Sequence, residues 1–292
     1  MIPLARRSSP RGSPLHGATV LITGAASGIG LGLATEAARK GATVVLWDRD
    51  AGPLDAAVDT VDAARTGPAE APVAQLVDVT DRDAVREAAE VAIEQTGGID
   101  VLVNNAGVVS GKWLTDLEEA DVRRTFEVNT LALYWVTQAL LPHMVERDRG
   151  RVVTIASASG LIGVARLTDY AASKWAAVGF DESLRVELRA RGSKVATTVV
   201  CPYYIDTGMF SGVRSKVEVL LPILEPDHVV DKTWAAVEKG RSRLHLPPLV
   251  GTLPLMRMLP VRAFDAVADL LGVNRTMDDF RGRTRPQETI DG

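Results

Sequence analysis

Apolar positions along the chain fall into short continuous runs separated by longer segments of helical periodicity. Six runs rich in β-branched residues occupy positions 18–23, 43–47, 73–77, 99–103, 151–156 and 194–200. Continuous apolar strands that alternate with helices are typical of a parallel sheet covered on both faces. Because crossovers between parallel strands are right-handed, the pattern predicts a single-domain α/β fold. We expect a Rossmann-type, doubly wound parallel sheet with helices on both faces.

Two helical segments are more apolar than the others. Residues 117–146 contain LALYWVTQALL, which is apolar around most of the helix, and residues 169–190 follow Thr168, which we expect to act as the N-cap. A helix that is apolar on all sides has more surface to bury than one sheet face can cover. We therefore expect these helices to form a subunit interface in a homodimer or homotetramer.

The two ends of the chain are polar. Residues 1–16 carry three arginines among Ser, Pro and Gly, without the apolar stretch of a secretory signal, and are predicted to be a disordered tail. Residues 276–292 are rich in Arg and Asp and are predicted to be a loosely held tail. The folded domain is then expected at 17–275.

Composition and charge narrow the possible partners. The 292 residues are 46% hydrophobic, enough for one large core, and the net charge of -4 gives no attraction to nucleic acid. There is no uncharged apolar run of about 18 residues, so no membrane-spanning helix is predicted. The single cysteine, Cys201, and four scattered histidines predict no disulfide and no metal site, and a cytoplasmic location is expected.

A glycine-rich loop, TGAASGIG (23–30), follows the first predicted strand and opens a helix. Glycines let backbone amides approach a pyrophosphate, and the N-terminus of a helix favours an anion. The same glycines would also suit a tight turn with no ligand. The candidate pyrophosphate-binding residues are Gly24, Ser27, Gly28, Ile29 and Gly30.

An acidic residue, Asp48, ends the second apolar run. A carboxylate there can accept hydrogen bonds from both hydroxyls of an adenosine ribose and would repel a 2′-phosphate. This favours NAD over NADP as the cofactor. The next residue, Arg49, could instead accommodate that phosphate or remain a solvated loop charge.

Two more segments follow predicted strands, where ligands bind in such sheets. Asp78 and Val79 come after the third run, and Asp78 either contacts adenine or caps the helix that starts near Asp81. Asn105, Ala106 and Gly107 come after the fourth run. The small residues Ala106 and Gly107 would let a ribose lie against the backbone, whereas Asn105 could simply fix the loop.

Tyr170 and Lys174 are four positions apart on a predicted helix and so share one face. Ser157 ends the fifth run. A tyrosine with a pKa of about 10 needs a pKa about 3 units lower to act as a base at neutral pH, and we expect Lys174 and a positive nicotinamide to lower it. In this scheme Tyr170 takes the hydroxyl proton of an alcohol, Ser157 hydrogen-bonds the same oxygen, and Lys174 also binds the cofactor ribose.

These motifs, together with NNAG (104–107) and Asn129, resemble in order and spacing the motif set of short-chain dehydrogenases/reductases. The resemblance implies that Asn129 holds a water that relays protons from Lys174; by itself Asn129 could simply bend a helix. It also implies that Pro202, Ile205 and Thr207 flank the nicotinamide. Where the family often has Pro-Gly, this chain has Pro202-Tyr203.

Within that family, CPYYIDTGMF (201–210), LLPILEP (220–226) and FDAVADLLGV (264–273) resemble the branch of epidermal-type retinol dehydrogenases and 17-beta-hydroxysteroid dehydrogenases. This implies an NAD(H)-dependent oxidoreductase for a small hydrophobic alcohol or carbonyl. The membrane-anchored members of the branch carry an N-terminal hydrophobic segment that this sequence does not show. A sensor that binds nicotinamide without catalysis, or a lipid-surface protein, is the alternative.

Two apolar segments lie on the expected substrate side. Residues 208–226, including Met209 and Phe210, could line the pocket as a lid or pack in the core. Residues 244–273 are apolar and interrupted by prolines, and could cap the pocket, bury against a partner subunit or dock on lipid. Arg257 and Arg262 are the only Lys or Arg residues in this segment, and a helix that binds a membrane surface usually has more. Burial in protein is therefore favoured over membrane-surface contact.

Overall fold

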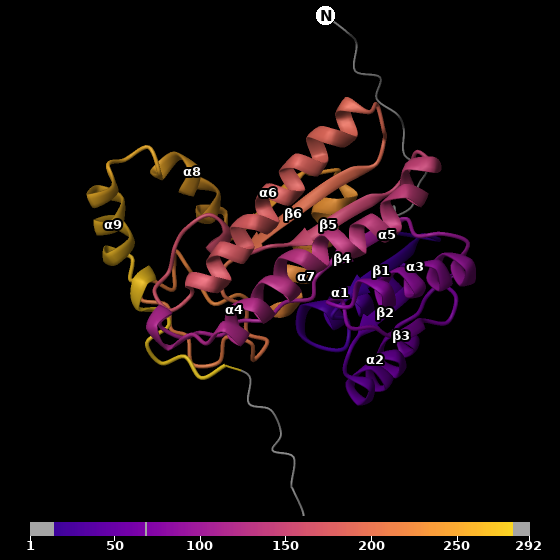
Figure 1. The fold of residues 1–292 in the computed structure, drawn as a ribbon, viewed down its shortest axis with the longest axis horizontal. Helices are drawn as coiled ribbons and strands as arrows, with labels where there is room; N and C mark the ends of the chain where they lie inside the picture. Colours follow the sequence, from indigo (N-terminus) through magenta and orange to yellow (C-terminus); the bar gives the residue numbers. More distant parts are fainter. Residues whose placement is uncertain (1–14, 68, 283–292) are drawn as a thin grey trace, which may run out of the picture.

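Seven parallel strands form the central sheet of the computed structural model, which describes residues 15–67 and 69–282 (Figure 1). Their spatial order is β3-β2-β1-β4-β5-β6-β7. The strands are β1 (Thr19–Thr23), β2 (Thr43–Asp48), β3 (Val73–Leu76), β4 (Val101–Asn104), β5 (Arg151–Ile155), β6 (Ala196–Pro202) and β7 (Arg243–Leu246). The predicted α/β, doubly wound parallel fold is confirmed.

Helices cover both faces of the sheet, as the continuous apolar strands require. One face packs against α1, α2 and α7, and the other against α3, α5 and α6. The helices are α1 (Gly28–Arg39), α2 (Ala51–Ala63), α3 (Arg82–Thr96), α4 (Glu119–Phe126), α5 (Ala132–Glu146), α6 (Thr168–Ala190), α7 (Pro226–Glu238), α8 (Leu253–Met256) and α9 (Val261–Leu270).

Alternate residues of a single strand supply the two cores. In β1, Val20 and Ile22 belong to the cluster under α1 and α7, whereas Leu21 belongs to the cluster under α3 and α5. All three side chains are fully buried because successive residues of a strand point to opposite faces. The three consecutive apolar residues of this strand therefore follow from its position inside the sheet, with helices on both faces.

The strand order reverses direction between β1 and β4, and this opens a crevice at the carboxyl ends of the strands. The hydroxyl of Thr23, the last residue of β1, accepts hydrogen bonds from the backbone N–H groups of Asn105 at 3.0 Å and Ala106 at 3.1 Å. The loops that follow β1 and β4 are thereby held together across the crevice.

The structure differs from the predicted elements in three places. β7 was not predicted: Arg243–Leu246 pairs with β6, so the first residues of the apolar segment 244–273 belong to the sheet. The predicted helix 117–146 is divided into α4 and α5 by a π-helical turn at Glu127–Leu131. Thr168 is the first residue of α6, and Leu167 occupies the N-cap without a side-chain cap, so the prediction for Thr168 is wrong.

The two terminal segments pack further into the fold than their polar composition indicates. Leu15 is fully buried in the core under α1, and Thr276 and Met277 are only 2% and 1% exposed. The guanidinium of Arg166 donates to the backbone oxygens of Met277 at 2.7 Å and Asp278 at 3.1 Å. The predicted boundaries at 16 and 276 therefore cut into packed structure, while 1–14 and 283–292 lie outside the described residues.

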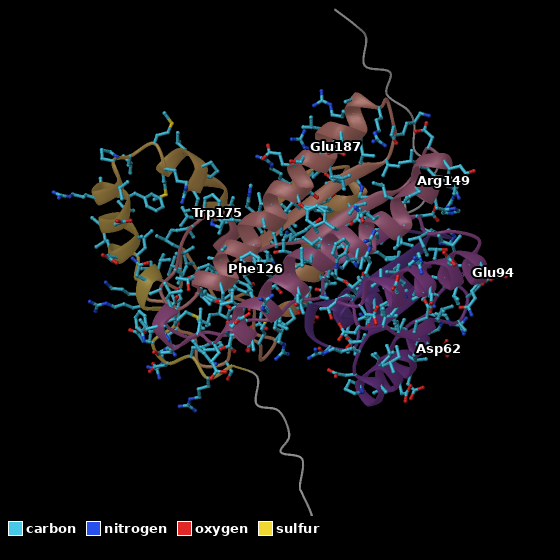
Figure 2. The ribbon with its side chains drawn as sticks, in the orientation of Figure 1. Asp62, Glu94, Phe126, Arg149, Trp175 and Glu187 are labelled. Atoms are coloured by element: carbon cyan, nitrogen blue, oxygen red, sulfur yellow. The ribbon has the colours of Figure 1, made fainter. Side chains whose placement is uncertain are left out.

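The short helices α8 and α9 lie at one side of the molecule, away from α2 and α3 (Figure 1). The guanidinium of Arg257 lies 4.3 Å from the ring of Trp175, a residue of α6 labelled in Figure 2, and 5.8 Å from that of Phe264. Their inner side chains, including Leu253 and Phe264, pack against the core cluster that contains Tyr170. The inner face of the segment 248–273 thus packs against this cluster, whereas its outer side chains, among them Met258 and Val261, stay exposed.

Candidate active site

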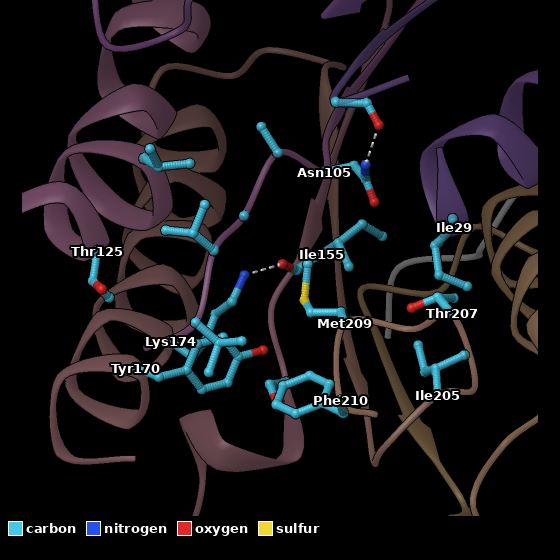
Figure 3. Close-up of a pocket in the computed structure, with 18 of the residues that line it drawn as sticks. Ile29, Asn105, Thr125, Ile155, Tyr170, Lys174, Ile205, Thr207, Met209 and Phe210 are labelled. Carbon is cyan, nitrogen blue, oxygen red and sulfur yellow. Dashed lines mark hydrogen bonds between the residues drawn. The ribbon is translucent and has the colours of Figure 1, made fainter. Parts of the chain in front are cut away.

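A cavity of about 640 Å³ opens at the carboxyl ends of the strands (Figure 3). Its wall is formed by the glycine loop, by the segments that follow β2 to β6, and by residues 273 and 282 near the end of the described chain. This volume lies within the range of small-molecule sites in proteins, about 300–1,000 Å³. The crevice predicted from the strand order is therefore a real cavity.

The glycine loop forms one end of this cavity. Gly24 and Gly28 have φ values of +64° and +56°, a conformation in which side chains are strained. Ser27 is the N-cap of α1, and it lines the cavity with Gly24, Gly28 and Ile29. Gly30 does not line the cavity; its Cα faces the loop itself, because an added Cβ would lie 2.1 Å from the carbonyl oxygen of Gly24.

Changing Gly30 to alanine is expected to displace the loop, because the new methyl group would overlap the Gly24 carbonyl. We expect both a lower melting temperature and at least about tenfold weaker cofactor binding, measured by thermal unfolding and by NADH fluorescence titration. Gly52→Ala is the matched control: Gly52 lies in α2 with nothing within 4 Å of an added Cβ, so stability should rise slightly. Unchanged NADH affinity in Gly30→Ala would contradict the prediction.

The carboxylate of Asp48 joins the end of β2 to the glycine loop. Its Oδ2 accepts a hydrogen bond from the backbone N–H of Ala26 at 2.9 Å, and its Oδ1 accepts from that of Arg49 at 2.8 Å. A carboxylate has about four acceptor sites, so capacity remains for a ligand in the cavity that Asp48 lines. Arg49 also lines the cavity and lies 4.0 Å from Asp50, so both alternatives for Arg49 stay open.

The segment after β3 also lines the cavity, through Asp78 and Val79. Asp78 accepts hydrogen bonds from the backbone N–H of Thr80 at 3.0 Å and from its hydroxyl at 2.8 Å. Asp81, not Asp78, caps α3, with its side chain accepting from two backbone N–H groups. The alternative in which Asp78 caps this helix is therefore wrong.

The segment after β4 is fixed by Asn105. Its Nδ2 donates to the backbone oxygens of Thr23 at 2.9 Å and Gly24 at 3.0 Å, and Figure 3 draws one of these two bonds. Ala106 and Gly107, which follow, line the cavity. Asn105 thus holds the glycine loop and the β4 loop in one arrangement, as well as lining the cavity.

Ser157, Tyr170 and Lys174 come together at the other end of the cavity, and all three are buried. Ser157 follows β5, while Tyr170 and Lys174 are one turn apart on α6. The Lys174 ammonium donates to the backbone oxygen of Ile155 at 2.9 Å and lies 5.7 Å from the centre of the Tyr170 ring (Figure 3). The predicted trio is thus assembled on one wall.

Burial shifts the pKa of both titratable members of the trio. It raises the pKa of Tyr170 to about 12, opposed by a hydrogen bond with Ser157, and it lowers the pKa of Lys174 to about 8. The sequence-based expectation of a lowered Tyr170 pKa, from Lys174 together with a positive nicotinamide, is therefore not met by the protein's own groups, because burial dominates the shift. Tyr170 is a protonated hydrogen-bond donor at neutral pH, and Lys174 is mostly a cation.

Residues 18–218 match the family model described as short chain dehydrogenase, which spans the glycine loop, the trio and the segment after β6. The chain belongs to the short-chain dehydrogenase family. It is 38% identical to epidermal retinol dehydrogenase 2 of Mus musculus, over 95% of this chain and 89% of that protein. It is 36% identical to retinol dehydrogenase 10-B of Danio rerio, over 93% and 87%. The predicted family and its retinol dehydrogenase branch are confirmed, and the protein is an oxidoreductase of the alcohol dehydrogenase type.

Solved structures of similar proteins hold either nicotinamide cofactor. A short-chain dehydrogenase/reductase from Burkholderia phymatum in complex with NAD is 26% identical, with a TM-score of 0.74, covering 93% of this chain and 98% of that one. A metagenomic short-chain oxidoreductase in complex with NADP is 31% identical, with a TM-score of 0.66, covering 79% and 97%. The family therefore accommodates both cofactors on this fold.

The site of this dehydrogenase fits a dinucleotide. At Gly24 an added Cβ would lie 3.0 Å from the Cα of Ala106, so glycine lets the two loops that line this part of the cavity approach each other closely. The first turn of α1 points its backbone N–H groups at the same place, where a pyrophosphate would lie. Among the residues that the structure describes, no group of three or more His, Cys, Asp or Glu side chains could hold a metal ion.

Asn129 of the dehydrogenase lies in the π-helical turn and does not line the cavity. Its Nδ2 donates to the backbone oxygen of Val108 at 2.9 Å and to the Ser173 hydroxyl at 3.0 Å, and its Oδ1 accepts from the Val108 N–H at 2.8 Å. The side chain therefore anchors the loop after β4 to α6. An added Cβ on Gly107 would lie 3.4 Å from Asn129 Oδ1 and 3.5 Å from Lys174 Nζ, so the three groups are close neighbours.

The segment after β6 places Pro202, Ile205 and Thr207 on the cavity wall. Tyr203 occupies the position where the family often has glycine, and its N–H donates to Leu246 of β7 at 2.7 Å. In the described part of the chain, only Asp148 and Arg166 among non-glycine residues have positive φ. The backbone at Tyr203 therefore needs no glycine.

Sequence reasoning found part of the substrate side of the cavity. Met209 and Phe210 line it, whereas Leu220 is 47% exposed and Val213, Leu221 and Leu224 are core residues. The wall also contains residues that no motif pointed to, because they lie in loops, on α4, in the π-helical turn and near the end of the described chain: Ser110, Asp121, Arg124, Thr125, Val128, Ile162, Val164 and Gly282. No helix in the part of the chain described here is long and apolar enough to span a bilayer.

Proposed function

We propose that this short-chain dehydrogenase oxidises a lipophilic secondary or allylic primary alcohol with NAD, or reduces the matching carbonyl with NADH. The observation that carries the proposal is the assembly of Ser157, Tyr170 and Lys174 in the same cavity as the glycine loop and Asp48. A buried Tyr–Lys pair without such a cavity would have only a structural role.

In the proposed reaction, the Tyr170 oxygen takes the proton of the substrate hydroxyl, and the Ser157 hydroxyl hydrogen-bonds the same oxygen. Lys174 stabilises the deprotonated form of Tyr170 and binds the cofactor ribose. A nicotinamide ring, when bound, supplies the carbon that accepts the hydride and a positive charge that lowers the pKa of Tyr170. Burial protects these steps from water, since each of the three side chains is at most 8% exposed.

Asn129 supports the route by which the proton leaves. Both hydrogens of its amide are used by Val108 and Ser173, so it keeps the π-helical turn and the β4 loop beside Lys174. A water held in this region would carry protons from the Lys174 ammonium towards solvent. The side chain of Asn129 then acts as a positioning group.

The lipophilic character of the substrate is supported by the wall beyond Tyr170. Ile162, Val164, Met209 and Phe210 line this part of the cavity, and the Phe210 ring lies 5.6 Å from that of Tyr170. Apolar side chains bind apolar ligands by removing both surfaces from water. The names of the similar retinol dehydrogenases agree with such a substrate.

Preference for NAD is supported by Asp48, whose carboxylate would repel a 2′-phosphate at the end of β2. The test is to follow NADH or NADPH absorbance while the protein is given a panel of retinols, hydroxysteroids and medium-chain secondary alcohols. We expect turnover with a KM at least about tenfold lower for NAD than for NADP. A preference for NADP would show that Arg49 governs the choice, and cofactor binding without turnover of any alcohol would favour the sensor alternative.

A dimer or tetramer is also proposed, from apolar side chains that remain exposed on the outer helices. Leu131, Tyr134 and Val186 are 41%, 42% and 52% exposed. They lie at the start of α5 and on α6, the two helices whose composition predicted an interface. Size-exclusion chromatography with light scattering should give a mass at least twice that of one chain, and a clean monomer would contradict this proposal.

A further inference from the structure

Asp169, the residue before Tyr170, carries a buried carboxylate with an unusual set of partners. It is 4% exposed, and its Oδ1 has no hydrogen-bond partner in the described structure. Its Oδ2 accepts hydrogen bonds from the hydroxyls of Ser110 and of Thr125, the latter at 2.8 Å. Both hydroxyl residues line the cavity, whereas Asp169 itself does not. The carboxylate therefore lies behind the cavity wall and controls two groups that face it.

The Asp169 side chain depends on two hydroxyls for its hydrogen bonds. It lies in the first turn of α6, and within the described chain only its Oδ2 is bonded, by the hydroxyls of Ser110 and Thr125. A buried polar group that loses its hydrogen-bond partner is destabilised. Because Oδ1 has no donor of its own, neither hydroxyl can turn away from Oδ2 without that loss.

This arrangement determines what the wall can offer to a ligand. Each hydroxyl has one hydrogen to donate and two lone pairs that accept. With both hydrogens committed to Asp169, the oxygens of Ser110 and Thr125 can act towards the cavity only as acceptors. Arg124, which also lines the cavity, is exposed, whereas Thr125 is buried. The buried part of this wall thus favours a ligand group that donates a hydrogen bond.

We infer that Ser110 and Thr125, held by Asp169, form a subsite for a second hydroxyl on the lipophilic substrate, distinct from the hydroxyl that is oxidised. The inference rests on the proposed function, because it assigns a part of the substrate cavity. It predicts that the subsite selects ligands by the direction of the hydrogen bond. The second hydroxyl of a diol can donate to the Ser110 and Thr125 oxygens, whereas a methyl ether or a ketone has only an acceptor to place against these acceptors. Mismatches of this kind reduce affinity because a buried polar group remains unpaired.

The test uses matched probes and the protein saturated with NADH, so that binding is read without turnover. The probes are a steroid diol and its monomethyl ether, and decanediol with methoxydecanol, none of which has a carbonyl that NADH could reduce. Isothermal titration calorimetry gives the Kd of each. We expect the preferred diol to bind about tenfold more tightly than its own methyl ether. If no diol of the panel binds more than about threefold more tightly than its ether, the inference is wrong.

Variants separate the subsite from general packing. Thr125→Val keeps the shape and removes the acceptor, and Ser110→Ala removes the other, so each should reduce the preference for the diol to about threefold or less. Asp169→Asn should do the same, because an amide can donate to the hydroxyls and free them to donate to an ether. Thr233→Val is the matched control: Thr233 is a fully buried threonine of α7 that bonds only its own helix, so the preference should persist.

The two proposals fail in different ways. If diols bind more tightly than ethers and no alcohol is oxidised, the proposed function is wrong and the subsite stands. If alcohols are oxidised and diols show no advantage in binding, the function stands and the subsite is wrong. Retention of the full preference in both Thr125→Val and Ser110→Ala would also overturn the assignment of the subsite to these residues.

Discussion

Changing Tyr170 to phenylalanine is expected to lower kcat/KM for alcohol oxidation by about 10²- to 10⁴-fold, the usual contribution of a positioned acid–base group. The substitution removes one oxygen from a ring that is 5% exposed and packed against Phe210 and Lys174, so the shape of the cavity is kept. Initial rates with the best alcohol of the panel, measured from NADH absorbance, test the prediction.

Binding of the cofactor should persist in this variant, because the glycine loop and Asp48 lie at the other end of the cavity. NADH fluorescence titration should therefore give a Kd within about threefold of the wild-type value. Tyr134→Phe, on the outer surface of α5, is the matched control and should retain full activity, since Tyr134 is 42% exposed and remote from the cavity. A Tyr170→Phe enzyme with more than a tenth of wild-type activity would assign the proton transfer to another group.

Changing Lys174 to methionine should have the second large effect. It should change the pH dependence of kcat/KM for alcohol oxidation. The positive charge beside Tyr170 favours the deprotonated form of that residue, so its removal raises the pKa of Tyr170. Alcohol oxidation requires the deprotonated form, and the rising limb of kcat/KM against pH should therefore move to higher pH. At neutral pH we expect a loss of about 10²-fold, because ribose binding is lost as well.

The thermal stability of Lys174→Met should rise at neutral pH, although its activity falls. Burial lowers the pKa of Lys174 from 10.5 to about 8, so the folded protein disfavours the charged form by about 3 kcal/mol. Below pH 8 this penalty is present in full, and it disappears as the pH rises towards 10.5, where the unfolded chain also loses the proton. Lys174→Met should thus unfold at a higher temperature than the wild type near pH 7, with the advantage fading by pH 10.5.

The control for both measurements is Lys232→Met, on the exposed surface of α7. It should leave the activity, its pH profile and the melting temperature nearly unchanged. A Lys174→Met enzyme that keeps the wild-type pH profile would show that the ammonium does not influence Tyr170. A fall in melting temperature at neutral pH would show that its hydrogen bond to the Ile155 oxygen outweighs the penalty of burying the charge.

Much of the fold could be predicted from sequence because most strands of a doubly wound sheet are apolar runs with recognisable ends. β1 and β5 begin and end within one residue of the runs 18–23 and 151–156. β7 was missed because its four residues, RLHL, mix charged and apolar side chains and precede two prolines. A strand at the edge of the sheet is paired on one side only, so its sequence carries a weaker signal.

The candidate site likewise has features that could be predicted from the sequence and features that could not. Side chains that lie in motifs, such as Tyr170 and Lys174, were found by their spacing, and the structure places them together. The direction of the pKa shift of Tyr170 could not be read from spacing, since it depends on burial by residues distant in sequence, among them Phe210. Ser110 and Thr125 were missed because their relation to Asp169 exists only after a loop, α4 and α6 have packed together.

The packing of residues 273–282 against the cavity has a consequence for the order of events during synthesis. The glycine loop, Asp48 and Asn105 leave the ribosome early, and this cofactor half can begin to fold while translation continues. Val273 and Gly282, which complete the wall near Phe210, emerge well after these residues. A growing chain can thus assemble the site for the dinucleotide before it has a closed compartment for the alcohol, so binding of the alcohol must wait until residues 273–282 have also emerged.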